Sequence, residues 1–394
     1  MKLLSKILCS LFFSALLSFS SVFAEGSDNL ETNAYQLIND GQEAFAAGDF
    51  ETAIQKYNKV LERYPRHART YFDRGMVYAR LNQLEKALND FNVSVSYDPT
   101  YDRIYFERGV VLFRLRNFDL ALDDFEYCIN LNPASPSPFF YRGLIYEAEN
   151  NFENAIAEFS QSIMRDPRNV QAYLHRANRF REQYEYRKAL ADYDAILELE
   201  PENSFVYCFR GMTLHDLKLY NQALDSYDKA LKLEPENAYI YLNRGILYDE
   251  IDRLDDAYND YEATIKYDPN QKFAYLNRGI ILQKKGQSLE AIDDFSKVIE
   301  LDPVNTNAYM ERALTYSDLK DYDNEFKDLS MVIELEPDDI EAYNLRIILC
   351  MLTEREFDVC SDCLKLMELD PNHPTNKICK IIFDVAKEMD SPCQ

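Results

Sequence analysis

Residues 238–269 read AYIYLNRGILYDEIDRLDDAYNDYEATIKYDP, and this stretch carries the pattern on which most of the chain is built. The same arrangement of small, aromatic and charged residues recurs every 34 residues, and each copy closes on a proline. These prolines are Pro65, Pro99, Pro133, Pro167, Pro201, Pro235, Pro269, Pro303, Pro337 and Pro371. A repeat of this length is typical of stacked supersecondary units, which bury their apolar faces against one another.

Three positions inside the unit predict how it packs. With the proline numbered 32, position 8 is Gly in seven copies and Ala in two, and position 20 is Ala in eight. Position 24 is aromatic in the same eight copies. Small residues on facing helices allow the two backbones to approach, the aromatic ring fills the space beside them, and the proline ends the second helix. Each repeat is therefore expected to be a pair of packed antiparallel helices.

The unit resembles the tetratricopeptide repeat, with Tyr at position 4 in eight copies where the family often has Trp. The resemblance implies an all-α fold, a right-handed superhelical solenoid of ten helix-turn-helix repeats within residues 34–371. We place the repeats at 34–67, 68–101, 102–135, 136–169, 170–203, 204–237, 238–271, 272–305, 306–339 and 340–373. Residues 374–394 are expected to form a cap helix and tail, because the end of a repeat array otherwise exposes an apolar face.

The first 24 residues have the pattern of a secretory signal peptide. Lys2 and Lys6 precede a short apolar run, and Val22-Phe23-Ala24 is a small-residue cleavage site, so residues 25–33 would begin the mature chain as a polar lead-in. The apolar run is too short for a membrane span, and no later stretch is long enough. We therefore expect an exported protein, either secreted or in a bacterial periplasm. The bacterial setting is favoured because the recurring Tyr-x-x-Arg-Gly motif resembles that of bacterial members of the family.

Composition narrows the class of partner. The chain holds 68 acidic against 43 basic residues, a net charge of −25, which disfavours binding to nucleic acid or anionic lipid. The four histidines lack metal-ligand spacing, and no phosphate-binding glycine loop or serine elbow motif occurs. No cofactor, metal or enzymatic activity is therefore expected. The partners would be protein or peptide segments, with self-association as a further possibility.

Position 7 is Arg in nine repeats, and position 23 on the second helix is acidic in eight of those nine. The first repeat reverses the signs, with Asp40 and Lys56. Antiparallel packing that brings position 8 against position 20 also brings 7 near 23, so we predict a partly buried ion pair in each repeat. The alternative is a groove lined by arginine that binds anions.

The resemblance implies that the first helix of each repeat lines a concave groove, through positions 2, 5, 6, 9, 12 and 13. The candidate apolar groove residues are Phe72, Met76, Phe106, Val110, Phe140 and Leu144. Contiguous apolar surface would mark an interaction site, although tight packing could instead make this stripe core. Basic candidates at one end are Arg69, Arg103 and Arg114, which would suit an acidic ligand segment. Asn243 and Asn277 match a family position that can bind peptide backbone.

Seven cysteines follow the signal peptide, and five of them lie in the last 45 residues. In an exported protein this favours a disulfide, and Cys350 with Cys363 is our candidate pair. The alternative is that these are inert buried thiols. The predicted function is a non-enzymatic scaffold or adaptor that binds protein or peptide in its groove. A chaperone-like holder of unfolded clients and a self-assembling structural solenoid remain the alternatives.

Overall fold

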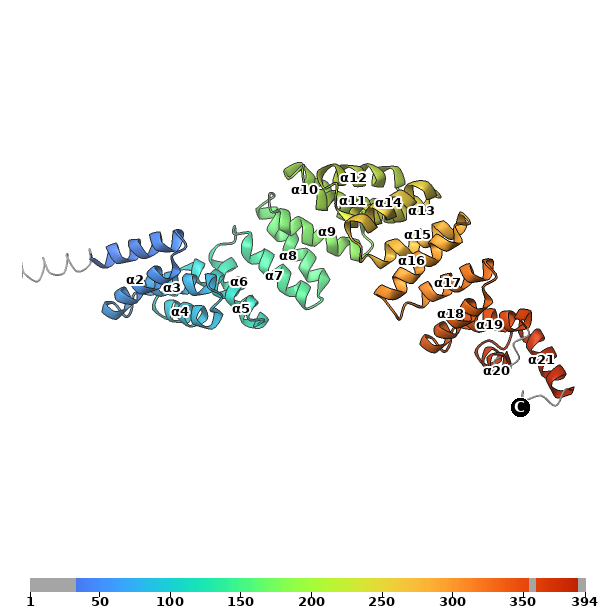
Figure 1. Ribbon diagram of the computed structural model, residues 1–394. Helices are drawn as coiled ribbons and strands as arrows, with labels where there is room; N and C mark the ends of the chain where they lie inside the picture. Colours follow the sequence, from blue (N-terminus) through green and yellow to red (C-terminus); the bar gives the residue numbers. More distant parts are fainter. Residues whose placement is uncertain (1–32, 354–358, 389–394) are drawn as a thin grey trace, which may run out of the picture. The chain divides into compact units, whose positions relative to one another are not determined.

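The computed structural model describes residues 33–353 and 359–388, and every element in these ranges is helical (Figure 1). The predicted signal peptide and nearly all of the lead-in lie outside the described residues. The chain divides after Leu199 into two compact units. The predicted all-α repeat fold is confirmed.

The first unit begins with a helix at residues 33–46 and continues as consecutive pairs of helices of similar length. They are α2 (Phe50–Arg63), α3 (Ala68–Arg80), α4 (Leu84–Tyr97), α5 (Asp102–Arg114), α6 (Phe118–Leu131), α7 (Ser137–Ala148), α8 (Phe152–Arg165), α9 (Val170–Glu182) and α10 (Tyr186–Leu199).

The second unit continues the same alternation and ends with one additional helix, α21, which contacts α20. Its helices are α11 (Ser204–Asp216), α12 (Tyr220–Leu233), α13 (Ala238–Glu250), α14 (Leu254–Tyr267), α15 (Lys272–Lys284), α16 (Ser288–Leu301), α17 (Thr306–Asp318), α18 (Tyr322–Leu335), α19 (Ile340–Thr353), α20 (Val359–Leu369) and α21 (Asn376–Glu388).

The turn between the two helices of a repeat depends on a left-handed residue at position 15. This residue has a positive φ in nine repeats, and only Gly48 and Gly286 among the nine are glycine. In the second repeat, the amide of Asn82 donates to the carbonyl of Ala79 and that of Gln83 to the carbonyl of Tyr78. This pair of bonds is a Schellman end, which satisfies carbonyls that the first helix leaves open. The turn is thus fixed by backbone bonds in most repeats rather than by glycine.

The small and aromatic positions pack as predicted. In the second repeat, Ala87 and Phe91 have no measurable exposure, and a Cβ added to Gly75 would lie 2.7 Å from the Phe91 ring. The same close approach occurs at each of the seven glycines of position 8. The first helix therefore lies directly against the aromatic ring of the second, and this contact forms the centre of each repeat's core.

The predicted ion pairs between positions 7 and 23 are confirmed. Arg74 binds both carboxylate oxygens of Asp90 at 2.7 Å, and Lys56 reaches Asp40 at 2.6 Å with the signs reversed. The other pairs are Arg108–Asp124, Arg142–Glu158, Arg176–Asp192, Arg244–Asp260, Arg278–Asp294, Arg312–Asp328 and Arg346–Asp362. Arg210 instead donates to the Ser226 hydroxyl at 2.7 Å. These guanidinium groups are engaged inside the repeats, which argues against an anion groove built from them.

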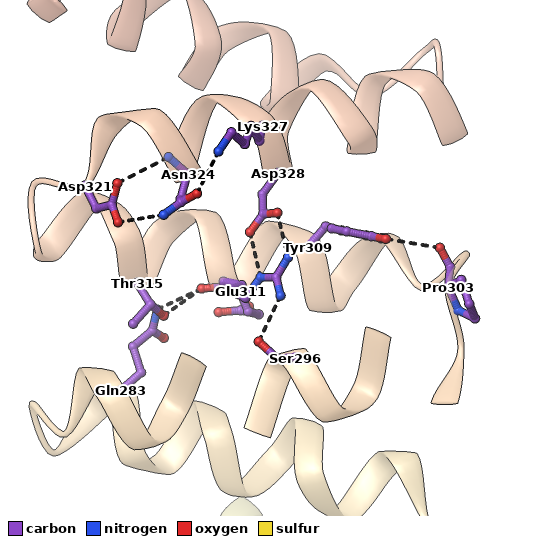
Figure 2. Close-up of polar contacts among 11 residues, drawn as sticks. Gln283, Ser296, Pro303, Tyr309, Glu311, Thr315, Asp321, Asn324, Lys327 and Asp328 are labelled. Atoms are coloured by element: carbon purple, nitrogen blue, oxygen red, sulfur yellow. Dashed lines mark hydrogen bonds and ion pairs between the residues drawn. The ribbon is translucent and has the colours of Figure 1, made fainter. Parts of the chain in front are cut away.

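The arginine also joins neighbouring repeats, which the sequence pattern did not reveal. In six repeats its remaining Nη donates to a polar residue at position 25 of the preceding repeat. Arg312 donates to both carboxylate oxygens of Asp328 and to the Ser296 hydroxyl, each at 2.8 Å, and both acceptors are labelled in Figure 2. One side chain therefore holds three helices together, and bidentate geometry makes such contacts specific for arginine.

The predicted Cys350–Cys363 disulfide is not formed. Cys363 bonds instead to Cys379 of α21, with the two Cα atoms 5.3 Å apart. Position 24 of a repeat faces the first helix of the next one, and after the last repeat α21 occupies that place. Cys350 is buried in the same apolar cluster as these two residues. The bond therefore joins the terminal helix to the last repeat, rather than joining the two helices within it.

Candidate functional site

The phenylalanines proposed for the groove belong largely to the core. Phe72 is 1% exposed, and Phe106 and Phe140 are half-buried. Each ring packs on the position-24 ring of its own repeat, with centroid distances of 5.7, 6.1 and 5.8 Å to Phe91, Phe125 and Phe159. Position 5 therefore faces the space between the helices in these repeats, and Phe72 is excluded as a groove contact.

The position-9 candidates of the first unit are only partly accessible. Met76, Val110 and Leu144 are half-buried, and the first two pack against the apolar clusters of their repeats. The predicted stripe is therefore not a continuous open surface in this unit. Much of it belongs to the core, as the alternative interpretation of the sequence held.

The three basic candidates are exposed but already bound to neighbours. Arg69 binds Asp73 at 3.1 Å and donates to the Tyr101 hydroxyl at 3.0 Å. Arg114 donates to the Ala79 carbonyl at 3.1 Å and to Asn82 at 2.9 Å, so it braces the end of α3. Asp73 therefore partly compensates the charge of Arg69, whereas the acceptors of Arg114 are neutral and hold its side chain without removing its charge.

Arg103 has a looser partner, Glu107, with a nitrogen–oxygen distance of 3.7 Å. Burial raises the pKa of Glu107, and the neighbouring Arg103 acts in the opposite direction. The charge of Arg103 therefore serves in part to hold the half-buried carboxylate of Glu107, so Arg69 and Arg103 each already have an acidic neighbour.

The two asparagines are not arranged as a pair of equivalent rungs. Asn243 donates to the Tyr239 carbonyl of its own helix at 2.7 Å. Asn277 lies beside Tyr261. Burial raises the pKa of the Tyr261 phenol, and the Asn277 amide offsets part of that rise. Both amide groups are therefore engaged within the protein, whereas a ladder that binds peptide backbone needs amides that are open to the ligand.

Two sets of exposed apolar side chains lie on the first helices of the second unit. At position 9, Ile246, Leu314 and Ile348 are 37%, 36% and 40% exposed. At position 2, Phe205, Tyr239 and Phe273 are about half exposed in three successive repeats. The second set was missed, although an aromatic residue at position 2 in three consecutive repeats was visible in the sequence. These six residues, each more accessible than the phenylalanines of the first unit, are the apolar candidates for a binding surface.

The acidic residues near this surface are partly paired. Glu250 accepts bonds from Tyr220 at 2.7 Å and lies 2.6 Å from His215 Nε2, and these contacts lower the pKa of its carboxyl group. Asp249 is 3.8 Å from Lys284. Among residues 33–353 and 359–388, no group of three His, Cys, Asp or Glu side chains could hold a metal ion.

Family models described as tetratricopeptide repeat match residues 39–95, 106–169, 140–204, 273–305 and 306–339, and one described as TPR repeat matches 211–252. Repeated helix pairs, central glycine–aromatic contacts and these matches together define an all-α repeat protein. The chain belongs to the tetratricopeptide repeat family. A comparison with curated proteins finds no match.

Solved structures resemble parts of this chain at low sequence identity. The chain is 24% identical to YrrB, described as a TPR protein with an unusual peptide-binding site, with a TM-score of 0.42 over 48% of this chain and 97% of that one. A tetratricopeptide repeat protein from Parabacteroides merdae ATCC 43184 is 19% identical, with a TM-score of 0.47 over 64% and 98%. PilF of Pseudomonas aeruginosa is 20% identical, with a TM-score of 0.47 over 55% and 97%.

Proposed function

We propose that this protein is a non-enzymatic scaffold that binds protein or peptide segments on the first helices of its repeats, in an exported compartment. The observation that carries the proposal is the exposure of Ile246, Leu314 and Ile348 at one repeat position. An apolar series at equivalent positions of stacked helices lies along one face, and such a surface is typical of an interaction site.

The internal polar contacts support a binding role over a catalytic one. The arginine at position 7 is engaged with side chains of its own repeat and, in six repeats, of the preceding one. Its regular use in packing explains why charged residues occur at fixed offsets without forming a reaction centre. Family membership also favours protein partners. The accessible apolar side chains of the first helices offer surface that can recognise another chain.

Export is supported by the amino-terminal pattern of two lysines, an apolar run and a small-residue cleavage site. None of the helices in the described part of the chain is long and apolar enough to span a membrane. The mature protein is expected to begin at Glu25. Intact mass of the protein recovered from the exported fraction checks this, and a mass that includes residues 1–24 contradicts it.

Recovery of partners from the native compartment tests the binding surface. We expect wild type to retain a discrete partner that the Ile246→Ser/Leu314→Ser/Ile348→Ser variant loses, because that variant removes accessible apolar area and changes no fully buried residue. The matched control is Leu289→Ser/Leu364→Ser, which changes two exposed leucines on second helices. Circular dichroism verifies that both variants fold.

The recovered set distinguishes the alternatives. A partner lost in the first variant and kept in the control supports a specific scaffold. Many unrelated unfolded chains, lost in the same way, would indicate a chaperone-like holder. Equal recovery by all three proteins would contradict the proposed surface, and concentration-dependent association of the purified chain would then favour self-assembly.

A further inference from the structure

Three aromatic side chains of the second unit, Phe205, Tyr239 and Phe273, form what we call the aromatic ladder. They occupy position 2 of successive repeats, at the start of α11, α13 and α15, and are 51%, 47% and 53% exposed. Large rings are costly to leave in water, since each buries substantial apolar area when it is covered. Their regular spacing along equivalent helices suits a ligand that runs across several repeats.

Two of the ladder rings contact other side chains of the first helices. The Tyr239 hydroxyl donates to the Met212 sulfur at 3.5 Å, which places position 2 of one repeat beside position 9 of the preceding repeat. The same offset relates Phe273 to Ile246, an exposed position-9 residue. Phe205 lies 4.3 Å from Phe209, measured between ring centroids. The Tyr239 ring therefore adjoins a position-9 side chain, and the repeat period predicts the same relation between Phe273 and Ile246.

An acidic hollow adjoins the first ring of the ladder. Its volume is about 600 Å³, and it is lined by Glu200, Pro201, Glu202, Asn203, Ser204, Phe205 and Glu234. Three carboxyl groups thus border the space, and no lysine or arginine is among the lining residues. Asn203 donates to Glu200 at 2.8 Å, a neutral contact that leaves the carboxylate charge uncompensated.

The far end of the ladder differs in charge. Lys272 lies over the Phe273 ring at 5.7 Å and binds Asp302 at 2.6 Å. That ring therefore already has a cation on its face, whereas Phe205 has carboxylates beside it. A ligand matched to this surface would place its positive charge at the Phe205 end.

We propose that the aromatic ladder and the acidic hollow bind an extended protein segment that carries lysine or arginine followed by apolar side chains. The cation enters the hollow between the carboxylates and beside the Phe205 ring, while the apolar side chains pack on Tyr239 and Phe273. Cation–π contact and attraction to the exposed carboxylates favour the first interaction, and burial of apolar area favours the second. The inference rests on the proposed function, because it assigns a ligand class to the same first-helix face.

The first unit provides an internal control. Position 2 of its second and third repeats is Arg69 and Arg103, which are exposed and basic. No aromatic ring occupies position 2 of these two repeats, so substitution of Arg69 and Arg103 should not weaken the binding of a basic peptide. Any response confined to the aromatic positions therefore reports on the ladder itself.

Fluorescence anisotropy of the complete mature chain tests the inference with three labelled peptides. The first carries two lysines followed by alternating leucine and serine, the second has glutamate in place of the lysines, and the third has serine in place of the leucines. We expect only the first to bind well, with weaker binding at higher salt because surface charge is screened. The Phe205→Ser/Tyr239→Ser/Phe273→Ser variant should reduce its affinity by at least about tenfold.

Two further variants separate the contributions. Glu200→Gln/Glu202→Gln/Glu234→Gln should weaken the first peptide about threefold or more and reduce the salt dependence of binding. Arg69→Ser/Arg103→Ser should leave the affinity unchanged. Equal binding of the glutamate peptide, full affinity in the ladder variant, or no binding by any peptide would each overturn the inference. The proposed function would survive such a result if the native partner were still lost in the Ile246, Leu314 and Ile348 variant.

Discussion

Repeats eight and nine are neighbours in the second unit and solve the same packing problem with different residues. In repeat eight, positions 8, 20 and 24 are Gly279, Ala291 and Phe295. In repeat nine they are Ala313, Glu325 and Leu329. All six residues are buried. From repeat eight to repeat nine, position 8 gains a methyl group and position 20 gains a longer side chain. At position 24 the aromatic ring is replaced by a smaller leucine.

This comparison shows that the repeat preserves a packed volume more strictly than it preserves residue types. A Cβ at Gly279 would lie 2.7 Å from the Phe295 ring, closer than such atoms approach without movement. In repeat nine the corresponding Cβ is present, and the smaller Leu329 leaves room for it. Close-packed interiors tolerate compensating exchanges better than single changes.

Repeat nine carries a cost that repeat eight does not. Glu325 is 6% exposed, and within the described part of the chain its Oε2 has no hydrogen-bond partner. Burial raises the pKa of this carboxyl group. A buried ionised oxygen without a partner is unfavourable. The small residue at position 20 of repeat eight avoids this penalty.

Both repeats retain the same ion pair, which leads to the largest expected effect. Arg278 binds Asp294 at 2.7 and 2.8 Å, and Arg312 binds Asp328 at 2.8 Å (Figure 2). Removal of either acid leaves a partly buried guanidinium, so Asp294→Ala and Asp328→Ala should each lower stability by about 3–5 kcal/mol. Amide hydrogen exchange within each repeat measures this local free energy of opening. Unequal losses in the two repeats would show that the pair depends on the packing around it.

The exchange at positions 8 and 24 predicts an intermediate effect. Gly279→Ala alone should destabilise repeat eight by about 1–3 kcal/mol, since the new methyl meets the Phe295 ring. Phe295→Leu alone should also destabilise it, because a cavity remains. The double variant reproduces the combination found in repeat nine, so the two losses should not add. The hydrogen-exchange cycle should give a favourable coupling of about 1 kcal/mol, and strict additivity would refute volume compensation.

The smallest effect concerns Glu325 and depends on pH. Because its folded pKa is raised above the ordinary 4.5, the carboxyl group disfavours folding once it is ionised and ceases to do so as pH falls. Glu325→Gln should therefore stabilise repeat nine at pH 7 by about 1 kcal/mol, and the advantage should shrink as the pH is lowered towards 4. The matched Ala291→Gln variant of repeat eight should be destabilised instead. A gain for Glu325→Gln that is independent of pH would contradict this account.

The sequence predicted the features that depend on fixed offsets within one unit. The helix pairs, the contact of position 8 with position 24 and the pairing of Arg244 with Asp260 all follow from antiparallel packing of two short helices. Such contacts can be derived because each involves residues less than one repeat apart, whose geometry is set by the helical period.

The candidate site was predicted less well, since exposure depends on every neighbour of a side chain. Phe72 was assigned to a groove but packs on Phe91, because the sequence alone did not determine which side of the helix the ring would face. The accessible rings at position 2, such as Tyr239, were missed because the apolar candidates were taken from positions 5 and 9, while position 2 supplied only the basic candidates Arg69 and Arg103. Their exposure is a property of the assembled stack.

By itself, the sequence determined the repeat period, the helical class and the ion pairs, since these depend on local spacing and on the chemistry of two facing helices. Only the tertiary structure decided three other features: the arginine bonds to the preceding repeat, the partner of Cys363, and the aromatic residues left in solvent. The physical reason is that these contacts form between repeats or at the end of the array. There the geometry is set by how successive units stack, and the pattern within one unit does not contain it.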